Sequence, residues 1–237
     1  MPKHGRSFAK RRLPATILSA LRQGRETASD ASPAVGSASS TLVASYNVHK
    51  CVGMDQRFDP ERIGAVIAEI GADVIALQEA AQRFGERNVL LDFAEIERRH
   101  GLVAVALAED AGRRGWHGNV LLFREAVARD VHPLQLPGVE PRGALVVDVD
   151  LDAGPLRVVA AHLGLLRRSR ALQAEAILAT ICARSERPTL LVGDLNEWRH
   201  GDRSSLYSLD PHFGPLGANL PTFPSRFPLF ALDRILG

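Results

Sequence analysis

Four oxygen-bearing side chains stand at or just beyond the ends of short apolar runs in this sequence. They are Asn47, Glu79, Asp194 and Asn196. Because open α/β sheets gather ligands beyond the carboxyl ends of their strands, these side chains are expected to meet at one site. Hard oxygen ligands, with no cysteine–histidine cluster among them, suit Mg²⁺ or Mn²⁺ better than Zn²⁺. Such an ion could polarise a phosphoryl oxygen and stabilise a leaving group.

The most informative of these strand ends is Gly193-Asp194-Leu195-Asn196. Residues two apart in extended backbone point the same way, so a carboxylate acceptor and an amide donor converge here. That pairing suits a water molecule attacking a phosphate. The motif alone also fits an ordinary turn, because Asp and Asn both favour turns. Polar residues also stand at the ends of two other predicted strands, and this repetition favours a functional site.

Composition predicts one globular core and a reducing environment. The chain has 237 residues, 46% of them hydrophobic, which is enough for a single sizeable domain. Its only two cysteines, Cys51 and Cys182, argue against a disulfide scaffold and favour a cytoplasmic location. No apolar stretch approaches the length of a membrane span, so no integral membrane segment is expected. The sequence leaves the oligomeric state open.

The basic charge lies at the N-terminus. Residues 1–40 carry seven Lys or Arg and two acidic residues, whereas the remainder carries 22 basic and 25 acidic residues. Residues 26–41 are rich in Ser, Ala, Gly and Pro and are typical of a linker. We therefore predict a disordered basic arm over residues 1–40 and a folded domain over residues 41–237. The mildly acidic domain does not favour a broad nucleic-acid-binding face.

The order of predicted elements is typical of an α/β protein. Strands are expected at 42–48, 73–78, 102–107, 119–123, 144–151, 156–163, 189–192 and 229–236, and helices at 60–70, 88–100 and 169–184. Asp59 and Pro60 are typical of a helix start, and Gly71 of a helix end. Residues 200–228, rich in proline, are expected to form a loop. Two packed mixed sheets with helices outside satisfy this order, as does a single mixed sheet.

Six short motifs occur together in a characteristic order. They are Ser-Tyr-Asn47, Leu-Gln-Glu79, Gly118-Asn119, Ala-Ala-His162, Gly-Asp194-Leu-Asn196 and Leu-Asp233-Arg-Ile. With these motifs the sequence, from about Thr41 to its last residue, resembles the endonuclease/exonuclease/phosphatase (DNase I-like) superfamily of metal-dependent phosphoesterases. The resemblance implies a four-layer α/β/β/α sandwich of two mixed sheets flanked by helices. It also implies a hydrolase that uses Mg²⁺ or Mn²⁺ on phosphodiesters or phosphomonoesters.

The resemblance also implies roles for individual residues. Glu79 corresponds to the principal metal ligand, with Asn47 beside it contacting the metal or phosphate. Asp194 corresponds to the group that orients or deprotonates the attacking water, and Asn196 to a donor to a phosphate oxygen. His162 corresponds to a histidine that donates to the phosphoryl group as negative charge grows, which stabilises the transition state selectively.

Further polar residues have roles that the resemblance indicates more loosely. Asn119 falls in the family's Gly-Asn segment, which is structural or faces the substrate. Arg142 falls where several relatives place a phosphate-binding arginine. By contrast, Arg167, Arg168 and Arg170 open a predicted helix, and we expect them to form a solvated face.

The family pattern continues beyond the strand that holds Asp233. In relatives, another strand leads to Ser-Asp-His, and an aspartate like Asp233 orients that catalytic histidine. The present sequence ends at Gly237 and contains no Ser-Asp-His. Because catalytic residues act as a unit and an incomplete sheet exposes unpaired edges, impaired activity and missing last strands are expected.

Several functions remain open at this stage. The leading prediction is a divalent-metal-dependent phosphoesterase acting on a lipid head group or small phosphoester, since the domain is mildly acidic and poor in aromatic residues. The first alternative is a non-catalytic module that binds phosphate and metal. The second is a Mg²⁺-dependent endonuclease acting on DNA. The fold class cannot choose among these substrates.

Overall fold

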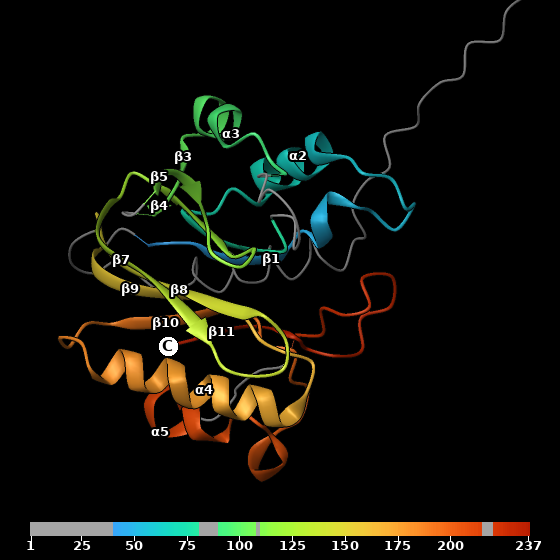
Figure 1. Cartoon of the computed structure of the whole chain (residues 1–237). Coiled ribbons are helices and arrows are strands. Elements are labelled where there is room, and N and C mark those ends of the chain that lie inside the picture. The colour runs from blue at the N-terminus through green and yellow to red at the C-terminus, as the bar shows by residue number, and fades with distance from the viewer. Residues whose placement is uncertain (1–39, 81–89, 108–109, 215–219) are drawn as a thin grey trace, which may run out of the picture. The chain divides into compact units, whose positions relative to one another are not determined.

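Two mixed sheets form the centre of the domain. The computed structural model describes residues 40–80, 90–107, 110–214 and 220–237 (Figure 1). The predicted N-terminal arm therefore lies, except for residue 40, outside the described residues. The first sheet has the order β1 (Val43–Asn47), β2 (Val74–Gln78), β6 (Val120–Arg124), β3 (Leu102–Ala104). Strands β1 and β2 are parallel, whereas β6 is antiparallel to both of its neighbours.

The second sheet has the order β11 (Asp233–Leu236), β10 (Thr189–Asp194), β9 (Gly154–His162), β8 (Arg142–Leu151), β7 (Val127–Leu136). Strands β9 and β10 are parallel and the other pairs are antiparallel. A separate ribbon pairs β4 (Ala106–Leu107) with β5 (Asp110–Arg114). Each sheet thus contributes one parallel pair, and these pairs lead to the candidate site.

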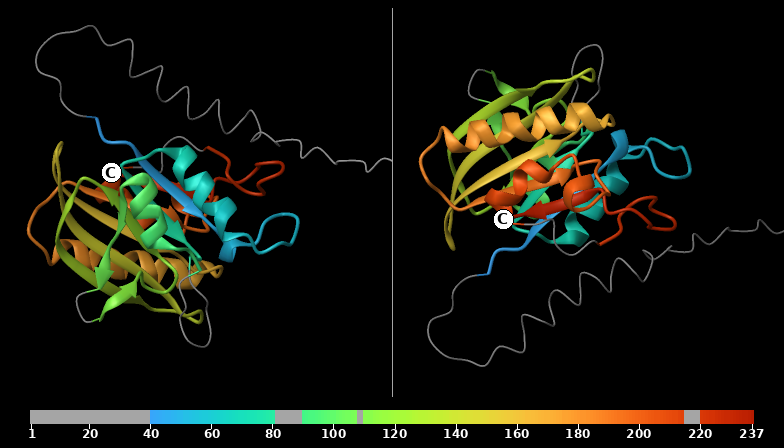
Figure 2. Two further views of the ribbon diagram at one scale, coloured as in Figure 1. Left: turned by 90° about the horizontal axis from the view of Figure 1, so that it is seen from above. Right: turned by 90° about the horizontal axis from the view of Figure 1, so that it is seen from below.

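Helices cover the outer face of each sheet (Figures 1 and 2). Helices α2 (Pro60–Ile70) and α3 (Phe93–His100) pack on the first sheet through a cluster that includes Ile67 and Ile75. Helix α4 (Arg167–Cys182) packs on the second sheet through a cluster that includes Ile177. A third cluster, dominated by valine, leucine and alanine, fills the space between the sheets. The predicted four-layer α/β/β/α sandwich is confirmed.

Local capping explains where the first two helices begin and end. The side chain of Asp59 accepts a hydrogen bond from the backbone N–H of Arg62, and Gly71 ends α2 with φ 62°. Helix α3 starts at Phe93, where Asp92 caps it, and residues 90–92 of the predicted helix are not helical. Residues 88 and 89 of that prediction lie outside the described residues. The predicted helix was too long because apolar residues at helical spacing continue upstream of the cap.

Three further sequence predictions need correction. Strand β7 was not predicted, because it is an edge strand whose side chains are largely exposed or half-buried and which contains Pro133. The final strand begins at Asp233 and not at residue 229. The predicted loop over residues 200–228 contains short helical turns at η2 (Gly201–Arg203), η3 (Tyr207–Leu209) and α5 (Asp210–Phe213). A further 3-10 turn, η1 (His49–Cys51), follows β1.

Within the described ranges, no helix is both long enough and apolar enough to cross a membrane. Both cysteines lie in this part of the chain and are free, with Cys51 buried and Cys182 exposed. Burial, with a smaller contribution from the charge of Asp59, raises the pKa of the Cys51 thiol to about 11. Cys51 is therefore a protonated core residue and not a reactive thiolate.

Candidate active site

The register of the two parallel pairs brings the predicted site residues to the same end of both sheets. Asn47, the last residue of β1, lies opposite Gln78, and Glu79 follows directly. In the second sheet His162, the last residue of β9, lies opposite Asp194, the last residue of β10. Parallel strands end at a common edge, so the polar residue that terminates each strand is placed beside its neighbour.

Asp194 connects the two sheets. Its Oδ2 accepts a hydrogen bond of 3.1 Å from Nδ2 of Asn47 and lies 3.8 Å from Nε2 of His162. Its Oδ1 accepts the backbone N–H of Asn196 at 3.1 Å, so the motif is also the Asx turn that its residue types allow. Burial raises the pKa of the Asp194 carboxyl, although bonds from Asn47 and Asn196 act in the opposite direction.

Glycine at position 193 is required by this geometry. Gly193 has φ 149°, and a Cβ built there would lie 1.9 Å from the backbone oxygen of Ala161. The close approach lets β10 pair with β9 immediately before the turn that carries Asp194. A side chain at this position would push the carboxylate away from His162.

Arg142 and His162 form a second part of the site. Nη1 of Arg142 lies 2.9 Å from Nδ1 of His162, and its Nη2 donates to Oε2 of Glu140 at 2.9 Å. A guanidinium can only donate, so Nδ1 of His162 accepts this bond and a neutral ring carries its proton on Nε2. The ring thus presents an N–H donor toward Asp194. Both side chains are buried.

Asp233 and Asn196 occupy the same end of the second sheet. Asp233 pairs with Asp194 across β10 and β11, and its Oδ1 is buried with no hydrogen-bond partner among the described residues. Burial, with the charge of Asp194, raises the pKa of Asp233 to about 6. Nδ2 of Asn196 donates to the backbone oxygen of Leu163 at 3.0 Å, which ties the turn to the end of β9.

Glu79 lies at the edge of the first sheet, partly exposed. Its side chain is 21% exposed, and Oε2 lies 3.8 Å from Nδ1 of His49. Both Glu79 (φ 55°) and Asn196 (φ 52°) hold left-handed backbone conformations, which non-glycine residues adopt at a cost. Such strained positions cluster at functional sites, and the two described here lie at strand ends of different sheets.

The donor set suits a hard cation. No group of three or more His, Cys, Asp or Glu that could hold a metal occurs among the described residues. Mg²⁺, however, is commonly held by one or two carboxylates while substrate phosphate and water complete its shell. Glu79 supplies a partly exposed carboxylate, and Asn47 supplies an amide oxygen that also accepts the backbone N–H of His49. These residues fit Mg²⁺ or Mn²⁺.

The amide of Asn119 has a clear structural role. Its Nδ2 donates to the backbone oxygens of Trp116 at 3.1 Å and Gly143 at 2.9 Å, fixing the turn before β6 to the start of β8. Its Oδ1 is buried and has no partner within the described chain. Only that oxygen is left for the predicted contact with substrate.

The structure corrects the sequence prediction for Arg170, which is buried and does not lie on a solvated face. Its guanidinium donates to the backbone oxygen of Leu165 at 2.6 Å, to Oγ of Ser205 at 3.0 Å and to Oε2 of Glu197 at 3.3 Å. Burial alone would raise the pKa of Glu197, but donors from Ser205, Arg199 and Arg170 together lower it to about 2. The network holds the loop after Asn196 against the loop after β9.

Sequence reasoning missed this network, although a signal for it exists. Arg170 and Gln173 continue the helical spacing of Ala174, Ile177 and Ile181, the residues that α4 buries. A polar residue on the buried face of a helix needs partners, and Gln173 has them. Its Oε1 accepts the backbone N–H of Gly164 at 2.8 Å, and its Nε2 donates to the backbone oxygen of Pro137 at 2.9 Å.

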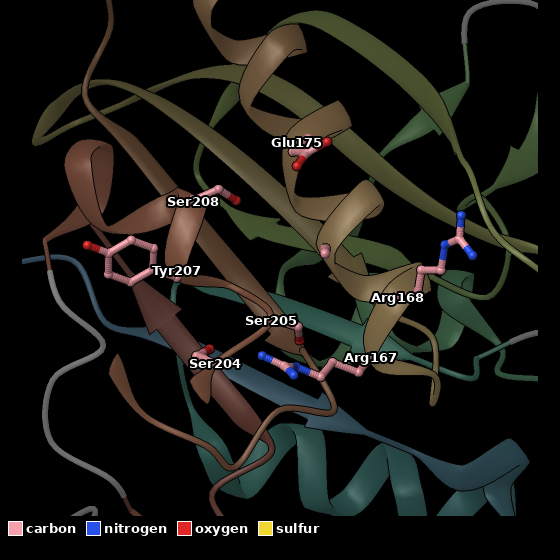
Figure 3. Close-up of a pocket in the computed structure, with 8 residues that line it drawn as sticks. Arg167, Arg168, Glu175, Ser204, Ser205, Tyr207 and Ser208 are labelled. Atoms are coloured by element: carbon pink, nitrogen blue, oxygen red, sulfur yellow. The ribbon is translucent and has the colours of Figure 1, made fainter. Parts of the chain in front are cut away.

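A cavity of about 400 Å³ lies beside the start of α4, between Arg167, Arg168, Ser204 and Tyr207 (Figure 3). None of the predicted site residues lines it. Ser205, which also lines the cavity, bonds to Arg170 and Glu197 and so belongs to the network that supports the turn after β10.

Fold and site together define a class: α/β/β/α sandwich proteins whose strand ends bring a carboxylate, an amide and an imidazole together between two mixed sheets. The model of the Endonuclease/Exonuclease/phosphatase family matches residues 44–237, and the chain belongs to this family. Comparison with curated proteins gave no significant match.

Solved structures share the fold. An endonuclease/exonuclease/phosphatase from Beutenbergia cavernae is 26% identical, with a TM-score of 0.51, covering 70% of this chain and 50% of its own. This chain thus spans about half the length of that relative. A functionally unknown conserved protein from Enterococcus faecalis is 19% identical, with a TM-score of 0.60 and coverage of 82% and 86%. A mannosyl-6-phosphatase from Bacteroides thetaiotaomicron is 14% identical, with a TM-score of 0.59 and coverage of 83% and 85%.

Proposed function

We propose that this protein is a divalent-metal-dependent phosphoesterase that hydrolyses its substrate by in-line attack of water. The observation that carries the proposal is the position of Asp194. Its carboxylate contacts Asn47 from one sheet and faces His162 from the other. A carboxylate, an amide donor and an imidazole N–H thereby surround one small region at the strand ends.

Each side chain has a role that its geometry supports. Asp194 orients the attacking water and accepts its proton, since burial raises the pKa of this carboxyl above its ordinary value. His162, held by Arg142 with its proton on Nε2, donates to a phosphoryl oxygen as charge develops. Asn196 contributes a further amide near the same turn, and Arg142 supplies positive charge.

The metal would be held by Glu79 and Asn47 at the edge of the first sheet. When bound, Mg²⁺ or Mn²⁺ supplies a Lewis acid that neutralises phosphoryl charge and steadies the leaving oxygen. Asn47 would then have two functions, because its oxygen would help to hold the cation while its Nδ2 positions Asp194. This coupling explains why an amide and not a second carboxylate suits the position.

For the substrate class we infer a lipid head group or another small phosphoester. The domain carries more acidic than basic residues, which does not favour a long polyanion. A cytoplasmic location is our inference from the two free cysteines.

The test is a hydrolysis assay with bis(p-nitrophenyl) phosphate and p-nitrophenyl phosphate, with and without Mg²⁺ or Mn²⁺. We expect metal-dependent turnover that falls at least about a hundredfold in Asp194→Asn and in His162→Asn. Matched controls are Asp202→Asn and His212→Asn, two exposed positions outside the site. Turnover that persists in Asp194→Asn contradicts the proposal.

The assay also separates the alternative of a non-catalytic module. Two forms are compared: the sequence as given, and the same sequence followed by a segment that carries Ser-Asp-His. Low turnover that the added segment raises agrees with the expectation of impaired activity and supports the phosphoesterase. Absence of turnover in both forms, together with retained Mg²⁺ or phosphate binding, favours the non-catalytic module.

A further inference from the structure

Two loops at the candidate active site expose large apolar side chains to solvent. One loop joins β1 to α2, and the other leads into β11. Together with Trp198 they form what we call the apolar loop surface, defined by Met54, Phe58, Trp198, Phe223, Phe227, Leu229 and Phe230. Met54, Phe227 and Leu229 are each at least 70% exposed. So many large exposed apolar groups in one place mark an interaction site.

The loops are ordered and lie side by side. An isolated bridge between Val52 and Phe58 closes the first loop, and one between Phe223 and Phe230 closes the second. Oγ of Ser225 lies 3.2 Å from Sδ of Met54, at the tips of the two loops. Both project in the same direction beyond the strand ends (Figure 2). Their apolar tips therefore face solvent together.

The same loops are continuous with the predicted catalytic residues. The first begins directly after Asn47, and Trp198 follows Asn196 by two positions. The second reaches Asp233 through Leu232, whose backbone oxygen accepts the N–H of Leu195 at 2.9 Å. A partner that contacts the loop tips is thus held next to the strand ends.

Cationic side chains are interleaved with the apolar ones. The guanidinium of Arg199 lies 4.4 Å from the centre of the Trp198 ring, and that of Arg226 lies 5.7 Å from the Phe227 ring. Lys50 is exposed on the same first loop. The two acidic residues of that loop, Asp55 and Asp59, both lie near Arg62, at 2.9 Å and 3.8 Å, so their charge is partly offset locally.

We propose that the apolar loop surface docks on a phospholipid bilayer that contains anionic lipid. The apolar tips enter the interface, while the arginines remain at the level of the lipid phosphates, as amphipathic surfaces do. Trp198 suits the same depth, because its ring is apolar and its N–H polar. The inference rests on the proposed phosphoesterase in one respect: the substrate is then a phosphoester displayed at the bilayer surface.

The side-chain types favour a bilayer over single-stranded nucleic acid. Bases bind through stacking on flat aromatic faces aligned with a basic groove. Five of the seven residues of the apolar loop surface are aromatic, but two of its three most exposed side chains, Met54 and Leu229, are aliphatic and have no π-face. Bilayer insertion uses aliphatic and aromatic side chains equally, because its driving force is burial of apolar area.

Vesicle flotation tests the proposal with the full chain and vesicles of phosphatidylcholine and phosphatidylglycerol. We expect binding that falls about tenfold or more in the triple variant Met54→Ser, Phe227→Ser, Leu229→Ser. The matched control is Val103→Ser, Val127→Ser, Leu172→Ser, three exposed apolar residues on β3, β7 and α4. It should bind within about twofold of the wild type. Thermal unfolding of both variants tests whether they are folded.

The salt dependence of flotation distinguishes binding through the apolar loop surface from binding through the basic N-terminal residues, which all variants share. At 0.5 M salt the screening length falls to about 4 Å, so electrostatic attraction weakens while apolar insertion persists. The difference between the wild type and the loop variant should remain. Equal flotation of these two at both salt concentrations overturns the proposal. So does binding to single-stranded oligonucleotide without binding to vesicles.

Failure here is distinguishable from failure of the proposed function. Asp194→Asn should float with vesicles as the wild type does, although its hydrolysis is lost. Metal-dependent turnover of bis(p-nitrophenyl) phosphate without vesicle binding refutes only the docking surface. Vesicle binding without turnover of any phosphoester refutes only the phosphoesterase.

Discussion

Single side chains at the site are held by bonds that also set their chemistry. Arg142 fixes the orientation of the His162 ring and, by donating to Nδ1, determines where a neutral ring carries its proton. Asn47 connects the proposed metal position to Asp194 through one amide group. Asp233 differs from these residues, because its buried Oδ1 lacks a partner within the described residues. Its ionisation therefore costs stability.

We predict that Asp233→Asn stabilises the protein at neutral pH. Burial and the neighbouring Asp194 raise the pKa of Asp233 to about 6 in the folded state. Between about pH 4 and 6 the unfolded chain loses this proton while the folded chain keeps it, so the wild type loses stability as pH rises. The asparagine variant should gain roughly 3 kcal/mol over the wild type well above pH 6.

Urea unfolding of both proteins at pH 4, 5, 6 and 7.5, in EDTA, measures this difference. The gain should be absent at pH 4, grow to about pH 6 and then remain constant. A gain that is independent of pH would contradict the prediction, because it would arise from packing and not from the proton. Ser208→Ala, which removes another buried oxygen without a described partner, serves as an uncharged control.

At the scale of elements, the sequence predicted most of what places the site. The apolar runs that end at Asn47, Glu79 and Asp194 are strands in the structure. The sequence predicts such strands directly, because buried parallel strands are nearly continuous apolar runs. Strand β7 was missed because an edge strand need not be apolar. Arg170 was misplaced because composition alone does not show that a charged residue has buried partners.

Arg170→Met should destabilise the protein by about 3 kcal/mol. The substitution removes the buried cationic partner of the fully buried Glu197 carboxylate and leaves only the partly exposed Arg199, 3.6 Å away, to pair with it. Breaking a buried ion pair by removing one member is costly. Urea unfolding at pH 7.5 measures the loss. Arg168→Met is the matched control, since Arg168 is exposed on the same helix, and its effect should stay within about 0.5 kcal/mol. Equal effects of both variants would show that the network is dispensable.

Two glycine substitutions should change stability in opposite directions. Gly193→Ala places a Cβ against the backbone of β9 and should cost at least about 2 kcal/mol, with loss of the Asp194 geometry. Gly64→Ala lies inside α2, where a Cβ meets nothing within 4 Å, and should stabilise by about 0.5–1 kcal/mol. Thermal and urea unfolding measure both. A tolerated Gly193→Ala would show that the pairing of β9 with β10 can shift.

At the scale of the whole domain, the site exists only when both sheets are packed together. Glu79 and Asn47 come from the first sheet, and His162, Asp194 and Asp233 come from the second. The apolar cluster between the sheets, which includes Val147, sets their separation and hence the bond from Asn47 to Asp194. Chain segments far apart in sequence meet there, so the sequence could suggest the site residues but not their distances.

This dependence on the whole fold gives a test of the metal that needs no catalytic turnover. A ligand that binds only the folded state stabilises it by RT ln(1 + [L]/Kd), which is about 2.7 kcal/mol at a hundredfold excess over Kd. Mg²⁺ or Mn²⁺ should therefore raise the midpoint of thermal unfolding in proportion to the logarithm of its concentration. The rise should be lost in Glu79→Gln and retained in Glu125→Gln, an exposed glutamate that follows β6. An equal rise in Glu79→Gln would place the cation elsewhere, because Glu79 is the carboxylate that the edge of the first sheet offers.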